Sequence, residues 1–245
     1  MNLAEAFLGI AAIALGVSTA KKGAERLHRA INADGPSLSS SPRTTYGRLP
    51  AMPPVVKQGT HMRTASGTMR TTLHSVRTLD DRLAAIAAKA NEGKTDPRVI
   101  AWARKELSKK CRGGWNGEQW CVPEKNTDAE IAAIYKALRR DIRYTSDVVG
   151  VDTYAHPKRT LEMAGGDCDE YSATACAALM AVGIPCRFKV IRTKDSPTWN
   201  HIYVEAGTPK QNPTKWVALD ASVAARPGWE APPSMVAETK IYPAY

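Results

Sequence analysis

The chain of 245 residues has few cysteines, and none of them forms a Cys-x-x-Cys pair. No histidine stands at a spacing that would complete a zinc site, so we predict no metal and see no sign of a cofactor. The five cysteines lie at positions 111, 121, 168, 176 and 186. Cys176 and Cys186 fall in apolar segments that predict burial. Cys111 and Cys121 enclose a turn-rich loop that a disulfide would staple, and the sequence leaves that pairing open.

Acidic residues are fewer than basic ones, and the formal net charge is +10. The excess is concentrated between Lys21 and Asp80, a segment that contains ten Lys and Arg residues and only three Asp and Glu residues. This segment lacks the interleaved aromatic residues of a surface that binds single-stranded nucleic acid, so we do not expect a nucleic-acid partner. The charge is typical of a solvated linker, with an acidic membrane surface as the alternative contact.

Long apolar runs are absent except at residues 3–20, which carry only one charged residue, Glu5. No basic segment precedes this run, which disfavours a secretory signal peptide. About 20 apolar residues are needed to span a bilayer, so a transmembrane helix is marginal here. We expect residues 3–20 to form a hydrophobic helix that docks onto a membrane or an assembly, and the localisation stays open.

The composition divides the chain into four parts. Residues 1–31 are the expected anchor helix with its basic flank, and residues 32–75 form a Pro-, Ser- and Thr-rich linker. Residues 76–228 carry the pattern of a folded domain. Residues 229–245 contain several prolines and predict an irregular tail that wraps the surface.

Within the folded part, the periodicity predicts helices before strands. Helices are expected at residues 79–90, at 98–110 and at 131–138 behind a capping motif that begins at Thr127. A buried, alanine-rich helix is expected to begin near Asp167 or Cys168 and to end before Gly183. Three strands follow, at 183–192, 199–206 and 215–221, separated by turns rich in Gly and Pro. The predicted fold class is α+β, with helices packed on an antiparallel sheet.

Cys168 stands at the start of the buried helix, directly after Gly165, Gly166 and Asp167. A thiolate at this position gains from the unpaired N–H groups and the dipole of a helix N-terminus. Asp167 can cap the helix, and Gly166 lets the backbone approach a ligand closely. These features predict a cysteine nucleophile with backbone donors for an oxyanion.

Two further residues complete a hydrolytic set. His201 begins an alternating strand, where it shares a face with Tyr203 and Glu205, and Asp220 ends the next strand. We predict that His201 exchanges a proton with Cys168 and that Asp220 fixes the tautomer of the ring.

The segments Gly166–Tyr171, Gly183–Arg187, His201–Glu205 and Trp216–Asp220 resemble the core of the transglutaminase-like superfamily, which has a papain-like fold. Residues 142–147 and 156–161 are similar to the lead-in of its bacterial and phage members. The resemblance covers residues 79–222. It implies a cysteine enzyme whose oxyanion hole uses the N–H of the nucleophile and a second donor from upstream. Tyr144 and Trp120 are the candidates for that donor.

The resemblance implies acyl transfer to water, with hydrolysis of peptide or isopeptide bonds in a protein or peptide substrate. Crosslinking by a transglutaminase reaction is the first alternative. A non-catalytic component of a membrane-linked or viral assembly, such as a phage virion, is the second. Two acidic residues in the first turn of the helix, Asp169 and Glu170, oppose the formation of a thiolate, so we expect His201 to supply much of the activation.

Overall fold

The computed structural model describes residues 43–64, 67–74, 76–115, 120–147 and 152–245. The predicted anchor at residues 3–20 lies outside these ranges. Within them, no helix has both the length and the apolar character that crossing a bilayer requires.

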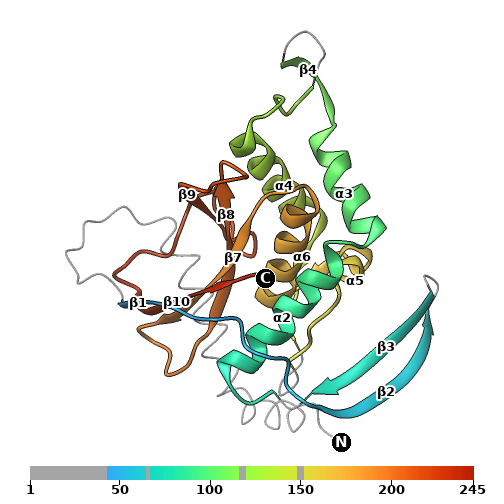
Figure 1. Cartoon of the computed structure of the whole chain (residues 1–245), viewed down its shortest axis with the longest axis vertical. Helices are drawn as coiled ribbons and strands as arrows, with labels where there is room; N and C mark the ends of the chain where they lie inside the picture. The colour runs from blue at the N-terminus through green and yellow to red at the C-terminus, as the bar shows by residue number, and fades with distance from the viewer. Residues whose placement is uncertain (1–42, 65–66, 75, 116–119, 148–151) are drawn as a thin grey trace, which may run out of the picture.

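The described helices lie together on one side of a five-stranded sheet (Figure 1). The helices are α2 (Leu79–Gly93), α3 (Pro97–Leu107), α4 (Thr127–Asp141), α5 (Pro157–Met163) and α6 (Cys168–Ala181). The strands of the sheet, in spatial order, are β1 (Arg43–Tyr46), β10 (Val236–Pro243), β7 (Cys186–Thr193), β8 (His201–Thr208) and β9 (Lys215–Leu219). Neighbouring strands are antiparallel except β1 and β10, which are parallel. The predicted α+β class is therefore confirmed.

The remaining strands form smaller pairs. An antiparallel hairpin of β2 (Val55–Thr64) and β3 (Gly67–His74) extends away from the helices and the sheet (Figure 1). Next to helix α6, β5 (Arg143–Tyr144) runs parallel to β6 (Gly165–Gly166). The strand β4 (Lys110–Trp115) makes one isolated bridge, between Lys110 and Trp120.

Helix α6 is the centre of the helical layer. Ten consecutive residues, from Glu170 to Leu179, are buried, because α6 is packed against α2, α3, α4, α5 and β8. A helix that is apolar around its whole circumference must be enclosed in this way, and its many alanines let the neighbouring elements approach closely. The core between α6 and the sheet is continued by Phe188 on β7 and Val204 on β8.

The opposite face of the sheet is also covered. Ile191 and Tyr203 pack there against Val223 and Ala231, from the segment between β9 and β10. Glu205 is buried on β8 and accepts charged hydrogen bonds from Arg187 at 2.5 Å and from Lys189 at 3.1 Å. Pairing of this kind is what a buried carboxylate requires.

Two parts of the chain differ from the sequence-based expectation. The expectation of an irregular tail is wrong for residues 236–243, which form β10 between β1 and β7. The expected linker is partly wrong as well, because residues 43–46, 55–64 and 67–74 form strands. In both cases the pairing partner is distant in the sequence or lies across a hairpin, so local composition did not reveal it.

The disulfide of the structure is not the one between Cys111 and Cys121 that the sequence left open. Cys176 on α6 and Cys186 on β7 form a disulfide inside the core, whereas Cys111, Cys121 and Cys168 are free. The burial predicted for Cys176 and Cys186 is confirmed. The thiols of Cys111 and Cys121 are hydrogen-bonded neighbours, and this contact together with burial raises the pKa of Cys121.

Candidate active site

The nucleophile turn is built by a capping box. Asp167 is the N-cap of α6, and its Oδ1 accepts a hydrogen bond from the N–H of Asp169 at 2.8 Å. Glu170 Oε2 accepts one in return from the N–H of Asp167 at 3.1 Å. Its other oxygen accepts from the N–H of Ala155 at 3.0 Å, which ties the preceding loop to the turn. Cys168 therefore occupies the first helical position, where backbone N–H groups have no acceptor within the helix.

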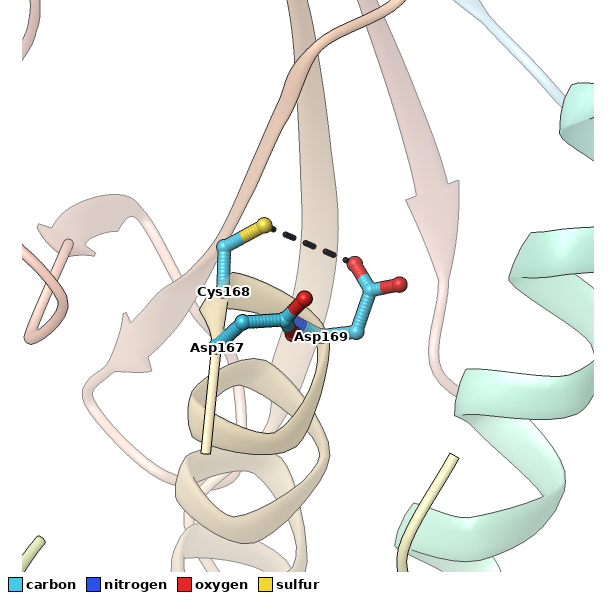
Figure 2. A group of neighbouring side chains, drawn as sticks. All are labelled: Asp167, Cys168 and Asp169. Atoms are coloured by element: carbon cyan, nitrogen blue, oxygen red, sulfur yellow. Dashed lines mark hydrogen bonds between the residues drawn. The ribbon is translucent and has the colours of Figure 1, made fainter. Parts of the chain in front are cut away.

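The thiol of Cys168 lies 3.6 Å from Oδ1 of Asp169, and the two groups point toward each other above the first turn (Figure 2). Burial raises the pKa of Cys168 well above its ordinary value, and the negative charges of Asp169 and Asp167 raise it further. A backbone hydrogen bond from Ile202 acts in the opposite direction and lowers it. The sulfur thus lies beside the main chain of β8, at the residue that follows His201.

His201 and Asp220 are in direct contact, with Nε2 of the ring 2.6 Å from Oδ2 of the carboxylate. This contact engages Nε2, so Nδ1 is the ring nitrogen left to exchange a proton with a thiol. Burial lowers the pKa of His201, but the charge and the hydrogen bond of Asp220 outweigh burial, and the pKa is raised above 6.5. Asp220 is itself buried, at 4% exposed, so the charge that acts on the ring is poorly screened.

Asp167 and Asp169 hold their protons well above the usual range of a carboxyl group. Burial and the neighbouring charges of Asp169 and Glu170 raise the pKa of Asp167 to about 9. Burial and the charge of Glu170 raise the pKa of Asp169 to about 7. Burial is the larger cause of these shifts, and the crowding of acidic groups adds to it. The charge of Asp169 also raises the pKa of Cys168, in agreement with the sequence-based expectation that Asp169 opposes thiolate formation.

The side chains of this turn carry carboxylate oxygens and a thiol sulfur, which are atom types that can coordinate a metal ion. Asp167, Cys168 and Asp169 each bring one donor atom within 4.8 Å of the others, and Asp147, Asp167 and Glu170 do the same. Hydrogen bonds within the turn already engage oxygens of Asp167 and Glu170. We assign no metal to either group.

The two candidate oxyanion donors lie in different places. Tyr144 is paired with Gly166 across β5 and β6, two residues before the nucleophile. Tyr144 is 48% exposed, yet its partial burial and the charges of Cys168 and Asp167 raise its pKa, so the phenol stays protonated at neutral pH. Trp120 instead lies opposite Lys110, whose Nζ is 5.0 Å from the centre of the indole ring. Its role as a donor stays a prediction.

One polar residue at the site is absent from the sequence-based set. Ser222 donates a hydrogen bond from its hydroxyl to Oδ1 of Asp220 at 2.7 Å. The sequence could have indicated Ser222 through its spacing from Asp220, because a serine two residues after an aspartate commonly makes a local side-chain hydrogen bond of this kind.

Residues 118–221 match the model of the transglutaminase-like superfamily. The matched segment resembles the core of that superfamily and contains Cys168, His201 and Asp220. No curated protein matches the chain.

Three solved structures illustrate the similarity to known folds. A candidate cysteine protease from Cytophaga hutchinsonii is 18% identical, with 58% of this chain and 41% of that chain covered and a TM-score of 0.39. A candidate protease from Parabacteroides distasonis is 14% identical, with 73% and 41% covered and a TM-score of 0.38. Calcium-bound LapG from Legionella pneumophila is 14% identical, with 66% and 74% covered and a TM-score of 0.34. The chain spans about two fifths of the length of the first two.

Proposed function

We propose that this protein is a cysteine-dependent acyl-transfer enzyme that hydrolyses peptide or isopeptide bonds through Cys168, His201 and Asp220. The observation that carries the proposal is the 2.6 Å contact between His201 and Asp220, together with a thiol at the start of α6 on which Asp220 and the backbone of Ile202 also act. The match of residues 118–221 to the transglutaminase-like superfamily supports the same reaction class.

The reaction begins with transfer of the thiol proton from Cys168 to Nδ1 of His201. The sulfur then attacks the substrate carbonyl carbon, and the carbonyl oxygen becomes an oxyanion. As the intermediate collapses, the bond to the leaving amine breaks, and the amine takes the proton from the imidazolium. The product of this half-reaction is a thioester on Cys168.

Hydrolysis of the thioester returns the enzyme to its starting state. Water gives a proton to His201 and attacks the thioester carbon, after which the sulfur leaves and regains a proton. Asp220 stabilises the imidazolium in both half-reactions because its carboxylate accepts a hydrogen bond from the Nε2–H group, with Nε2 and Oδ2 2.6 Å apart. The N–H of Cys168 is the oxyanion donor that the helix start supplies, and we assign the second donor to the hydroxyl of Tyr144, which lies on the strand paired with Gly166.

Proton transfer to His201 is essential in this site, because the environment of Cys168 favours the neutral thiol. Burial and two carboxyl groups raise the thiol pKa, so the helix N-terminus alone does not generate a thiolate at neutral pH. The sulfur therefore becomes nucleophilic as it loses its proton to a base, which is the role we give to His201.

The proposal is tested with the full chain and p-nitrophenyl acetate, a small activated acyl donor. We expect an initial burst of p-nitrophenolate and an acetyl group on Cys168, found by peptide mass spectrometry. A mixed peptide library then serves as the substrate for hydrolysis. The variant Cys168→Ala should lose the burst and the peptide cleavage, with a fall in rate of at least about 10³-fold.

The matched control is the double variant Cys111→Ser/Cys121→Ser, which removes the other two free thiols and keeps Cys168. It should behave as the wild type. Equal cleavage by wild type and Cys168→Ala would show that the chain is not a cysteine hydrolase of this design.

A further inference from the structure

The carboxylate of Asp220 is held at both of its oxygens. Oδ2 lies 2.6 Å from Nε2 of His201, and Oδ1 accepts the hydroxyl of Ser222 at 2.7 Å. A carboxylate on a single bond can turn about that bond, whereas one with both oxygens engaged has a fixed plane. The plane in turn sets the direction in which Oδ2 meets the ring.

We propose that Ser222 is a positioning residue of the active site, which orients Asp220 so that its carboxylate accepts a hydrogen bond from the Nε2–H group of His201. The hydrogen-bonded chain then runs from Ser222 through Asp220 to His201. Ser222 does not contact the substrate in this arrangement. It acts through Asp220.

The turn that carries Ser222 is fixed from outside by helix α4. The hydroxyl of Tyr135 donates to the carbonyl of Ala225 at 2.7 Å and lies 3.3 Å from the carbonyl of Asp220. Nη1 of Arg139 donates to the carbonyl of Ala221 at 3.1 Å. These bonds bracket Ser222 on both sides, so its hydroxyl is presented to Asp220 by a main chain that has little freedom to move. Burial raises the pKa of Tyr135 to about 12, so the hydroxyl remains a donor at neutral pH.

The pKa of His201 depends on how the Asp220 carboxylate meets the ring, so a titration of His201 tests the orienting role of Ser222. The charged and titratable groups that act on the ring are Asp220 at the end of β9, Asp169 on α6 and Tyr203, whose ring centre is 5.9 Å away on β8. Asp220 contributes both charge and a hydrogen bond. A change that turns the Asp220 carboxylate therefore weakens the main cause of the raised pKa.

The experiment follows the imidazole resonance of His201 by NMR as a function of pH, in the full chain. The resonance is assigned by its absence from the variant His201→Gln. We expect Ser222→Ala to lower the pKa of His201 toward 6.5, because the freed carboxylate loses its alignment with the ring. In the hydrolysis assay the same variant should reduce kcat about tenfold and leave KM unchanged, since Ser222 acts on the base and not on substrate binding.

A matched pair of variants separates the hydroxyl from the size of the side chain. Ser222→Thr keeps the hydroxyl and should retain both the raised pKa and the turnover, whereas the similarly shaped Ser222→Val should behave like Ser222→Ala. A pKa of His201 that is unchanged or raised in both Ser222→Ala and Ser222→Val would overturn the positioning role. The kinetic part rests on the proposed function, but the imidazole titration does not. A wild type without turnover would refute the enzyme, and the titration would still decide the role of Ser222.

Discussion

The Cys168 thiol and the Asp169 carboxyl group are neighbours on the first turn of α6, with Sγ 3.6 Å from Oδ1. Asp169 has a pKa of about 7, so its charge changes in the range where a cysteine enzyme usually works. When Asp169 is ionised it repels the developing thiolate and so raises the pKa of Cys168. The proposed nucleophile is thus coupled to a group outside the proposed set of Cys168, His201 and Asp220.

Replacing Asp169 by Asn should make the thiol more reactive. Without the carboxylate, one cause of the raised pKa of Cys168 disappears, and its reaction with iodoacetamide should begin at lower pH. The rate is measured between pH 6 and 10 (about the range of thiol titration) by peptide mapping of Cys168, because Cys111 and Cys121 also react. The control is Glu124→Gln, which removes an exposed carboxylate paired only with Lys125. An unchanged profile in Asp169→Asn would contradict the coupling.

The same substitution should stabilise the fold at neutral pH. In the folded chain Asp169 keeps its proton up to about pH 7, whereas in the unfolded chain it loses it near the ordinary value of 3.8. Stability from this group is present below 3.8 and is lost as the pH rises to about 7. The melting temperature of Asp169→Asn should therefore equal that of the wild type in acid and exceed it at pH 8. Calorimetry at both pH values checks this, and a constant difference between the two chains would refute it.

The pH dependence of kcat/KM should reveal the pKa of His201, the proposed general base. Because His201 must be neutral to accept a proton and its pKa is raised, kcat/KM should increase with pH through a value above 6.5. Asp220→Asn removes the charge that raises the pKa, so the acidic limb should move to lower pH while kcat falls on the order of 10⁴-fold. Stopped assays across the pH range test both effects. A limb that does not move in the variant would argue against Asp220 as the partner of the ring.

Gly166 has no space for a side chain. A Cβ atom built there would lie 2.5 Å from Cβ of Glu170, which is buried and holds the N–H groups of Asp167 and Ala155. We expect Gly166→Ala to cost about 1–3 kcal/mol in the free energy of unfolding and to displace the nucleophile turn. Gly165→Ala is the control, since its closest contact is the Thr145 hydroxyl at 3.1 Å, a side-chain atom able to move. Urea unfolding compares the two, and equal losses would show that the Glu170 contact is not the cause.

The disulfide between Cys176 and Cys186 should stabilise the junction of α6 and β7. Its loop is short, so removing it in Cys176→Ala/Cys186→Ala is expected to cost about 2–3 kcal/mol. The urea midpoint of this variant is compared with that of Cys111→Ser/Cys121→Ser, whose thiols are free in the structure. If reducing agent and the alanine pair both leave the midpoint unchanged, the bridge does not contribute.

Much of the nucleophile region was predictable because its signals are local. The capping residue Asp167, the two glycines before it and the alanine-rich run that follows act within a few residues of Cys168, and α6 begins at Cys168. The strands that hold His201 and Asp220 were predictable for the same reason, since alternation and turn residues specify β8 and β9.

The features that the sequence did not reveal depend on distant partners. Cys176 and Cys186 lie in a helix and a strand, and only the packing of α6 against β7 brings their sulfurs together. The strand at residues 236–243 is stabilised by β1, about two hundred positions earlier, and by β7. The contact from Ser222 to Asp220 is local, but the hydroxyl of a serine in a turn has many possible acceptors. The sequence alone does not show that its acceptor is the Asp220 carboxylate, because the position of that carboxylate depends on the pairing of β9.

The position of β10 has a consequence for biosynthesis. A ribosome makes α6, β7, β8 and β9 before it makes residues 236–243, yet β10 pairs with β7 inside the sheet and provides the partner of β1. Until those residues emerge, one edge of β7 is unpaired and open to the strands of other nascent chains. The sheet therefore closes late, and a chaperone that shields β7 during translation would protect the protein from misassembly.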